Sequence, residues 1–439
     1  MTDTQIGFWS VLGIVLLIYS GMHVAVALTL LSFLGVLLIK DNYTIASKML
    51  ALAASDSISG YIFGVVPLFV LMGMFIAVSG IGKDTFDVAN RLFRGVRGGL
   101  GIATVVANAV FAAVTGISIA SAVVFTKVAV PEMIRHGYAP RFAVGVVVGS
   151  SVLGMLIPPS LLLILFGILT ETSIGDLFKA GIMPGLLLSA AYCVAILVMA
   201  YRFPNYVGGV NSRADSKGDH EIRVFDALLK ILPIALLIAL VLGGIYAGWF
   251  TPTESGAVGA LGAFILALGK RQLNWVKLWQ VLVETGHVTV AILFLLIAAN
   301  MYGRMLAMSG VIGSIESLFV ESGLGLYSVV TVYLVIILLA GMFLDSTSIL
   351  MILVPLIYPV MQGFSVNFVW FGIVTVIAVE VGLITPPFGI AAFVVKSTLD
   401  DQRIGLNEVF YGALPYVLMM IIVLALVVMF PQISLIFVR

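Results

Sequence analysis

Long apolar stretches, separated by short polar segments, run along almost the whole chain. Many of them reach about 18 residues or more, so that as helices they match the ~30 Å hydrocarbon core of a bilayer. A membrane β-barrel instead needs segments of about ten residues in which apolar and polar positions alternate, and the sequence lacks them. The pattern therefore predicts an all-α polytopic membrane protein.

Two apolar segments in the first half are interrupted near their middle. Polar residues and glycine interrupt residues 99–135, and such a segment can enter and leave the membrane on one side as a re-entrant hairpin. Pro158 and Pro159 interrupt residues 141–170, where they remove amide donors and predict a broken helix. With the uninterrupted helices around them, these segments predict a first structural repeat over residues 1–201.

The second half has the same order of segments. Its predicted hairpin covers residues 323–362 and its broken helix residues 366–397, within a second repeat over residues 227–439; a polar linker, residues 202–226, lies between the repeats. Matching residues recur at spacings of 224 to 230 positions, namely Pro131 with Pro355, Pro158-Pro159 with Pro386-Pro387, and Lys40 with Lys270. Segments and residues that match in the same order at similar spacings indicate an internal duplication.

Two less apolar stretches carry charged residues among apolar ones. Residues 81–98 are expected to form an amphipathic helix that lies along the membrane surface rather than crossing it. Residues 270–284 form a similar amphipathic stretch, and a separate helix is expected to follow it at residues 285–308.

The number of crossings predicts the topology. Each repeat would contain five crossings and one hairpin, and an odd number of crossings turns the second repeat upside down relative to the first. Under that arrangement, 17 of the 22 basic residues lie on the side away from the N-terminus. The positive-inside rule then places the linker in the cytoplasm and both termini outside. The basic residues on the other side are Lys40, Lys48, Lys179, Arg304 and Arg439.

The two hairpin tips carry the side chains that best suit a small, hard cation. The second tip places one carboxylate and three hydroxyls in sequence, from Asp345 to Ser348, and the first tip runs from Thr115 to Ser121. Hard cations prefer oxygen ligands such as these and freed backbone carbonyls, so the pattern favours sodium. Other roles stay open, because Asp345 could cap a half-helix and each hydroxyl could bond back to a helix carbonyl.

Few residues outside the tips indicate chemistry. Glu254 suits the start of a helix, whereas Glu380, inside an apolar segment, suits either ion or proton coupling or pairing with a neighbour. Four scattered histidines and one cysteine provide no transition-metal cluster, and no phosphate-binding glycine loop is present. A net charge of +1 offers no basic face for nucleic acid. Weaker candidates are Asn108, Asn300 and Arg304.

In combination, several motifs resemble the large membrane subunit of tripartite ATP-independent periplasmic (TRAP) transporters, of the DctM type. The resemblance covers nearly the whole chain, and no single motif would be specific alone. The motifs are Ala107-Asn-Ala-Val-Phe-Ala-Ala-Val-Thr-Gly116, Ile157-Pro-Pro-Ser160, Ser173-Ile-Gly-Asp176, Ala180-Gly-Ile-Met-Pro-Gly185, Thr251-Pro-Thr-Glu254, Gly341 to Ser346, and Glu380-Val-Gly-Leu-Ile-Thr-Pro-Pro-Phe-Gly389.

The resemblance implies a sodium-driven elevator, in which the hairpins and broken helices move against a scaffold and import a small carboxylate-bearing organic acid. It also implies two partners, a small four-helix membrane subunit and a periplasmic substrate-binding protein. The expected location is a bacterial inner membrane, with both termini periplasmic. Neither an enzymatic activity nor a nucleic-acid partner is expected.

Carried over position by position, the resemblance implies one sodium site at the first tip beside the first proline break, a second at the other tip, and a solute between the tips. The sodium candidates are Gly116, Ser118, Ser121, Pro158, Asp345, Ser346, Thr347 and Thr385, and the substrate candidates are Ser118, Ser121, Thr347 and Ser348. A stand-alone sodium or proton symporter of similar architecture is the nearest alternative. A channel lined by the polar tips is a further one.

Overall fold

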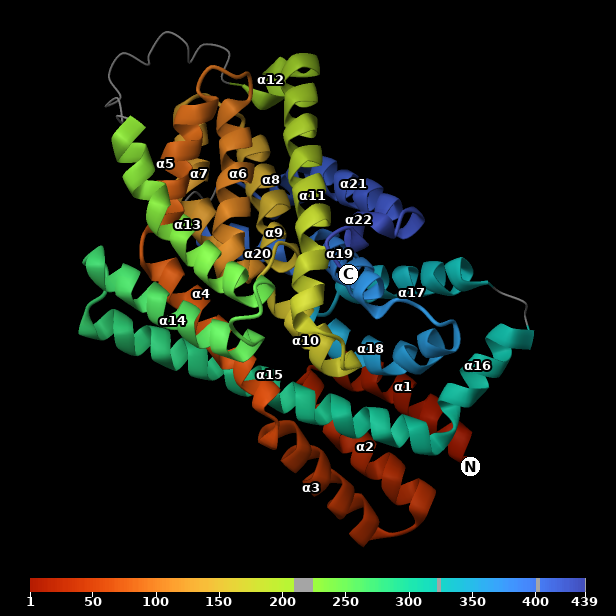
Figure 1. The fold of residues 1–439 in the computed structure, drawn as a ribbon. Helices are drawn as coiled ribbons and strands as arrows, with labels where there is room; N and C mark the ends of the chain where they lie inside the picture. Colours follow the sequence, from red (N-terminus) through yellow and green to blue (C-terminus); the bar gives the residue numbers. More distant parts are fainter. Residues whose placement is uncertain (209–223, 322–324, 400–402, 439) are drawn as a thin grey trace.

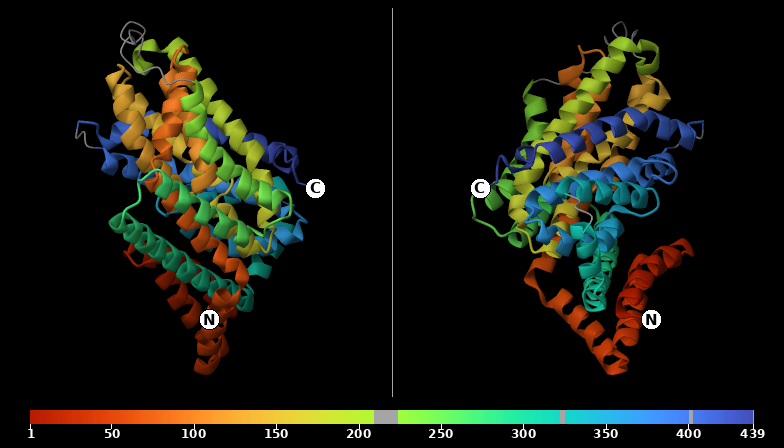
Figure 2. Two further views of the ribbon diagram at one scale, coloured as in Figure 1. Left: turned by 60° about the vertical axis from the view of Figure 1, so that its left-hand side comes forward. Right: turned by 90° about the vertical axis from the view of Figure 1, so that its right-hand side faces the viewer.

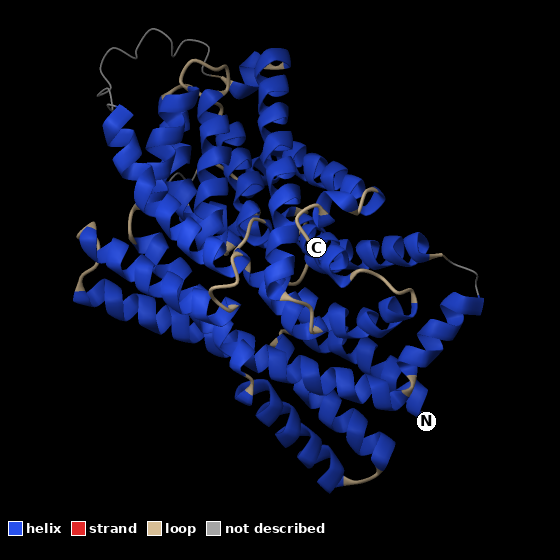
Figure 3. Cartoon of the chain, viewed as in Figure 1, coloured by secondary structure: helices blue, strands red, loops and turns tan. Residues whose placement is uncertain are grey.

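The computed structural model describes residues 1–208, 224–321, 325–399 and 403–438 (Figure 1). Within these ranges helices are the only regular elements, and a single bridge pairs Tyr138 with Gly208 (Figure 3). The described part of the chain is therefore all-α, as the apolar pattern predicts. Most of the predicted linker, residues 209–223, lies outside the described residues, as do residues 323–324 at the start of the predicted second hairpin.

The helices of the first half begin with three outer helices and end with the long helix α11. Their bounds are α1 Asp3–Tyr19, α2 Val24–Lys40, α3 Tyr43–Ser59, the 3-10 turn η1 Tyr61–Gly64, α4 Val65–Val78, α5 Ile81–Phe93, α6 Gly99–Thr115, α7 Ser118–Arg135, α8 Pro140–Ser151, α9 Leu153–Leu156, α10 Leu161–Thr170, α11 Ile174–Arg202 and α12 Pro204–Val207.

The second half contains the longest helix, α15, and a second hairpin followed by an interrupted helix. Its bounds are α13 Val224–Tyr246, α14 Pro252–Gly269, α15 Trp275–Ser309, α16 Val311–Glu321, α17 Leu326–Gly341, α18 Ser346–Gly363, α19 Phe368–Ile384, α20 Ile390–Thr398, α21 Leu406–Met429 and α22 Gln432–Leu435.

Eight helical segments in the described ranges are long and apolar enough to cross a membrane. Their outer faces are apolar as well. On α11, for example, Leu186, Val194 and Val198 are each more than half exposed. Such a face is stable against lipid tails, and the backbone groups behind it are satisfied within each helix. The structure thus has the surface of a multi-pass membrane protein.

An outer layer of α1, α2, α3 and α15 projects from the rest of the molecule (Figure 2). Three polar contacts within this layer join α15 to α3 and to α1. Arg304 forms an ion pair of 2.6 Å with Asp56, and Asn300 donates a hydrogen bond of 2.7 Å to Ser57. Tyr302 lies 3.3 Å from the hydroxyl of Ser10. Arg304 and Asn300 therefore join α15 to α3.

One predicted boundary is wrong. The expected amphipathic stretch at 270–284 and separate helix at 285–308 are instead joined in one helix, α15, which begins at Trp275. The corresponding part of the first half is interrupted, because Gly60 adopts an extended conformation between α3 and η1. At the repeat spacing, Gly60 corresponds to Val290, a residue that continues the helix.

The two hairpins exchange partners in the inner bundle. The second helix of the first hairpin, α7, packs against α20, the segment after the second break. In the same way, α18 of the second hairpin packs against α10, the segment after the first break. This reciprocal packing brings both hairpins and both broken helices into one bundle around which α4, α11 and α21 are arranged (Figure 1).

Candidate functional site: two hairpin tips on two helix breaks

The first tip turns at a glycine that no other residue could replace without strain. Gly116 ends α6 in the left-handed conformation, with φ of +63°. A Cβ atom there would lie 2.5 Å from the carbonyl oxygen of Pro159. The carbonyl oxygen of Gly116 in turn accepts a hydrogen bond of 3.2 Å from the amide of Leu161. The tip is therefore tied directly to the break in the neighbouring helix.

The first break is built from residues that cannot continue a helix. The α9 segment ends at Leu156, and the Pro158-Pro159 pair, joined by a cis peptide bond, contributes no amide donor. Ser160 restarts the helix as N-cap of α10, accepting a hydrogen bond of 3.3 Å from the amide of Leu163. The break is thus an ordered connection beside the hairpin tip.

Two serines of the first tip are buried without hydrogen-bond partners. The side chains of Ser118 and Ser121 are 2% and 0% exposed, and in the described part of the chain neither hydroxyl has a partner. Nearby Thr115 and Thr126 instead donate to helix carbonyls at 3.0 and 2.6 Å. A buried hydroxyl left unpaired costs about 1–3 kcal/mol. Unpaired buried oxygens of this kind fit a cation that prefers oxygen ligands.

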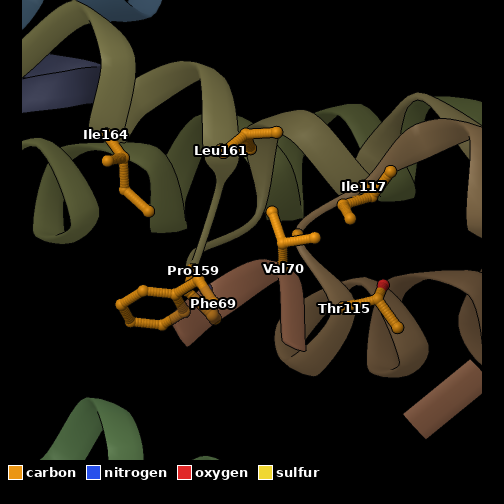
Figure 4. A pocket seen from close by; sticks show the side chains of 8 residues that line it. Phe69, Val70, Thr115, Ile117, Pro159, Leu161 and Ile164 are labelled. Carbon is orange, nitrogen blue, oxygen red and sulfur yellow. The ribbon is translucent and has the colours of Figure 1, made fainter. Parts of the chain in front are cut away.

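A small pocket lies beside the first tip, on the side of α4 (Figure 4). Mostly apolar side chains line it, and Thr115 is the one polar side chain among them. The buried serines are not part of this lining. The lining residues are Phe69, Val70, Thr115, Gly116, Ile117, Pro159, Leu161 and Ile164.

Asp345 caps α18 at the second tip. Its carboxylate accepts hydrogen bonds of 3.1 Å from the amides of both Thr347 and Ser348, and the Ser348 hydroxyl donates to the other carboxylate oxygen. Asp345 is exposed. The capping role considered from the sequence is therefore present, and it also engages the hydroxyl of Ser348, a predicted substrate residue.

The other hydroxyls of the second site have different partners. Ser346 donates a hydrogen bond of 3.0 Å to Glu380 of α19. Thr385, at the end of α19, donates to the carbonyl of Val381 at 2.7 Å, a bond that threonine often makes within a helix. The sequence leaves Glu380 open between ion or proton coupling and pairing with a neighbour, because its contact with Ser346 depends on how two distant helices pack.

The second tip also lies against its own helix break. Gly341 approaches Gly382 so closely that a Cβ atom on Gly341 would lie 2.5 Å from the Cα atom of Gly382. The rings of Phe343 in the tip and Phe388 in the break are 5.7 Å apart. Each tip thus rests on the break of its own half, while the reciprocal packing of α7 and α18 connects the two halves.

The remaining sequence candidates have structural roles. Glu254 forms a capping box with Thr251 at the start of α14, and its carboxylate accepts hydrogen bonds from the amide and the hydroxyl of Thr251. Asn108 donates a hydrogen bond of 2.6 Å to Ser150, while its side-chain oxygen has no partner among the described residues. No group of three or more His, Cys, Asp or Glu side chains in the described ranges could hold a metal ion.

The fold and this site define a class of protein, a polytopic helical membrane transporter with paired hairpins and broken helices. The chain belongs to the family described as the tripartite ATP-independent periplasmic transporter, DctM component, whose model matches residues 11–433. The resemblance seen in the sequence motifs is thereby confirmed.

Relatives within this family carry different solute names. The chain is 33% identical over 390 residues to the C4-dicarboxylate TRAP transporter large permease protein DctM of Pseudomonas aeruginosa, covering 88% of each chain. It is 30% identical to the sialic acid TRAP transporter large permease protein SiaM of Vibrio cholerae, covering 97% of each. Because both relatives align over most of the chain at similar identity, overall similarity does not select one solute.

A solved structure shares the fold. The YdaH transporter of Alcanivorax borkumensis, described as having an unusual topology, superposes with a TM-score of 0.63 over 88% of this chain and 89% of its own. The two sequences are 13% identical, so this similarity concerns the arrangement of helices alone.

Proposed function

We propose that this chain is the large permease of a sodium-coupled TRAP importer for a small carboxylate-bearing organic acid. The observation that carries the proposal is the pair of buried, unpartnered hydroxyls of Ser118 and Ser121 at a tip tied to a helix break. These oxygens fit a sodium ion, which would stabilise the seated tip when bound. Among the described residues, no cluster suited to a transition metal competes with this assignment.

The proposed sodium sites follow the two tips. Gly116, Ser118, Ser121 and Pro158 would form the first site. Asp345, Ser346, Thr347 and Thr385 would form the second. Ser118, Ser121, Thr347 and Ser348 would face the solute, and the names of the relatives, C4-dicarboxylate and sialic acid permeases, support a carboxylate as its common chemical group.

The proposed mechanism is an elevator. Each tip is held on its own break, and each hairpin packs against the other half, so the inner bundle can move as one body against the outer layer. The bundle would carry solute and sodium together across a bacterial inner membrane. A small four-helix membrane subunit would accompany the chain, a periplasmic binding protein would deliver the solute, and both termini would be periplasmic.

Coupling to two sodium ions would provide enough free energy to accumulate the solute in the cell. If two Na⁺ enter with one monoanion, one net positive charge moves inward, and at ~100 mV this releases about 2.3 kcal/mol. Two tenfold sodium gradients add roughly 2.8 kcal/mol. The sum of about 5 kcal/mol sustains accumulation of several thousand-fold.

Uptake into proteoliposomes tests the proposal. The chain is reconstituted with its small subunit, and succinate or N-acetylneuraminate is supplied with or without the binding protein under an inward sodium gradient. We expect saturable uptake that requires both the gradient and the binding protein. Uptake of free solute without the binding protein would favour a stand-alone symporter, and non-saturable flux independent of sodium would favour a channel.

A further inference from the structure

Glu380 is the most deeply buried carboxylate of the second site. It lies in α19, where every residue from Trp370 to Ile384 is buried, and it is 1% exposed. An ionised carboxylate in such surroundings is far less stable than in water unless a positive charge or several donors compensate it. Beneath a hairpin tip, this side chain therefore needs either a compensating cation or a proton.

Among the described residues, only one of the two carboxylate oxygens of Glu380 has a hydrogen-bond partner. One oxygen of Glu380 accepts the 3.0 Å hydrogen bond from Ser346, which begins α18 at the tip. The other oxygen has no hydrogen-bond partner within the described ranges. Nor does a Lys, Arg or His of those ranges form an ion pair with Glu380.

Among the described residues, the side chains that interact with Glu380 are those of Ser346 and Tyr192, and neither carries a positive charge. The hydroxyl of Tyr192, in α11, is buried without a partner in the described structure and interacts electrostatically with Glu380. Tyr416 of α21, whose ring lies 5.3 Å from that of Tyr192, also has an unpartnered hydroxyl there. On α17, Tyr333 is already paired with Thr375, at 3.4 Å.

Asp345 and Glu380 differ in how many of their carboxylate oxygens already accept hydrogen bonds. Both oxygens of Asp345 accept hydrogen bonds from its own tip, and the residue is exposed to solvent. Glu380 is enclosed, and one of its oxygens has no hydrogen-bond partner among the described residues, next to Ser346, a predicted sodium ligand. A buried free carboxylate oxygen beside a hydroxyl is a strong ligand set for a hard monovalent cation.

We propose that Glu380 supplies the buried negative charge of the second sodium site, together with the hydroxyl of Ser346. This inference rests on the proposed sodium coupling and adds a residue to it. Bound sodium would compensate the carboxylate and hold the start of α18 against α19. The hairpin tip would therefore be seated on the broken helix more firmly when sodium is present.

Equilibrium sodium binding tests the role of Glu380 separately from transport. The purified complex of the full chain with its small subunit is titrated with radioactive ²²Na⁺ at constant ionic strength, with K⁺ replacing Na⁺. Thermal unfolding is followed in parallel. For Glu380→Gln, which keeps the shape and an acceptor for Ser346, we expect one fewer sodium ion per chain and a smaller stabilisation by sodium. Glu254→Gln, the same change in a capping box, should bind sodium like the wild type.

Two further variants keep the test decisive should Glu380→Gln not fold. Glu380→Asp retains the charge but withdraws it from Ser346, and Ser346→Ala retains Glu380 but removes the hydroxyl. We expect each to weaken sodium binding about tenfold without removing a site. Wild-type stoichiometry and affinity in Glu380→Gln, or in both of these variants, would overturn the inference. Absence of any sodium binding by the wild type would instead refute the proposed sodium coupling itself.

Discussion

The amide of Leu161 donates a hydrogen bond of 3.2 Å to the carbonyl oxygen of Gly116, across 45 residues of sequence. This bond joins the first residue of α10 to the last turn of α6. It satisfies one amide at a helix start and one carbonyl at a helix end, groups that have no partner within their own helices. The hairpin tip and the helix break therefore form one structural unit.

Replacing Gly116 should disrupt that unit. In Gly116→Ala the left-handed conformation alone costs about 1–2 kcal/mol, and the new Cβ atom would meet the carbonyl oxygen of Pro159 at 2.5 Å. We expect at least about a tenfold loss of uptake, which corresponds to ~1.4 kcal/mol, and a lower unfolding temperature. Gly95→Ala is the matched control, because no atom lies within 4 Å of a Cβ built there. Equal activity of the two variants would contradict the tight seating of the tip.

Removing the unpartnered serine hydroxyls should weaken sodium dependence. For Ser118→Ala and for Ser121→Ala we expect the sodium concentration at half-maximal uptake to rise about tenfold, or ~1.4 kcal/mol. Without sodium, each variant should be at least as stable as the wild type, because a buried group with no partner has been removed. If the serines were structural instead, removing the hydroxyl would lower the stability without sodium and leave the sodium dependence of uptake unchanged. Thr126→Val, on the same helix but back-bonded to Ala122, should leave the sodium dependence unchanged.

The two roles of Asp345 can be separated by comparing two substitutions. Asp345→Ala removes the helix cap, at about 1 kcal/mol, and the charge, whereas Asp345→Asn retains a capping oxygen and removes only the charge. If Asp345 belongs to the sodium site, both variants lose sodium-dependent uptake, and only Asp345→Ala unfolds at a lower temperature. Wild-type sodium dependence in Asp345→Asn would leave Asp345 as a helix cap alone.

The predicted orientation can be measured with single cysteines in a Cys193→Ser background, because Cys193 is the only cysteine of the chain. Thr44→Cys, predicted to be periplasmic, should react with a membrane-impermeant maleimide added to intact spheroplasts. Gly95→Cys, beside the basic residues predicted to be cytoplasmic, should react only after permeabilisation. Both residues are exposed on the surface of the chain, as labelling requires. The reverse labelling pattern would show that the topology is opposite to the proposed one, with both termini in the cytoplasm.

Much of the site is readable in the sequence, because glycine and proline impose backbone constraints that are independent of tertiary contacts. Gly116 and the two proline pairs mark the first tip and both breaks for this reason. Which hydroxyls bond back to a helix is harder to predict. Ser118 is the first residue of α7 and has no preceding turn to accept its proton, whereas Thr126, two turns later, has one.

The contact between Ser346 and Glu380 could not be predicted. These residues are 34 positions apart, and each lies on a helix whose rotation is set by packing against several others. The continuity of α15 was also missed, because the charged residues near its start resemble those of a surface helix. In both cases the apolar pattern defines the segments, and tertiary packing decides how they are joined.

The unbroken course of α15 limits how the protein can sit in its bilayer. Thirty-five residues at 1.5 Å each give a rod of about 52 Å, well beyond the ~30 Å of hydrocarbon. Such a rod can remain in the apolar layer only by leaning far from the membrane normal, so it sets a minimum width for the protein in the plane of the membrane. The corresponding part of the first half is interrupted at Gly60, whereas the second half contains this one continuous helix.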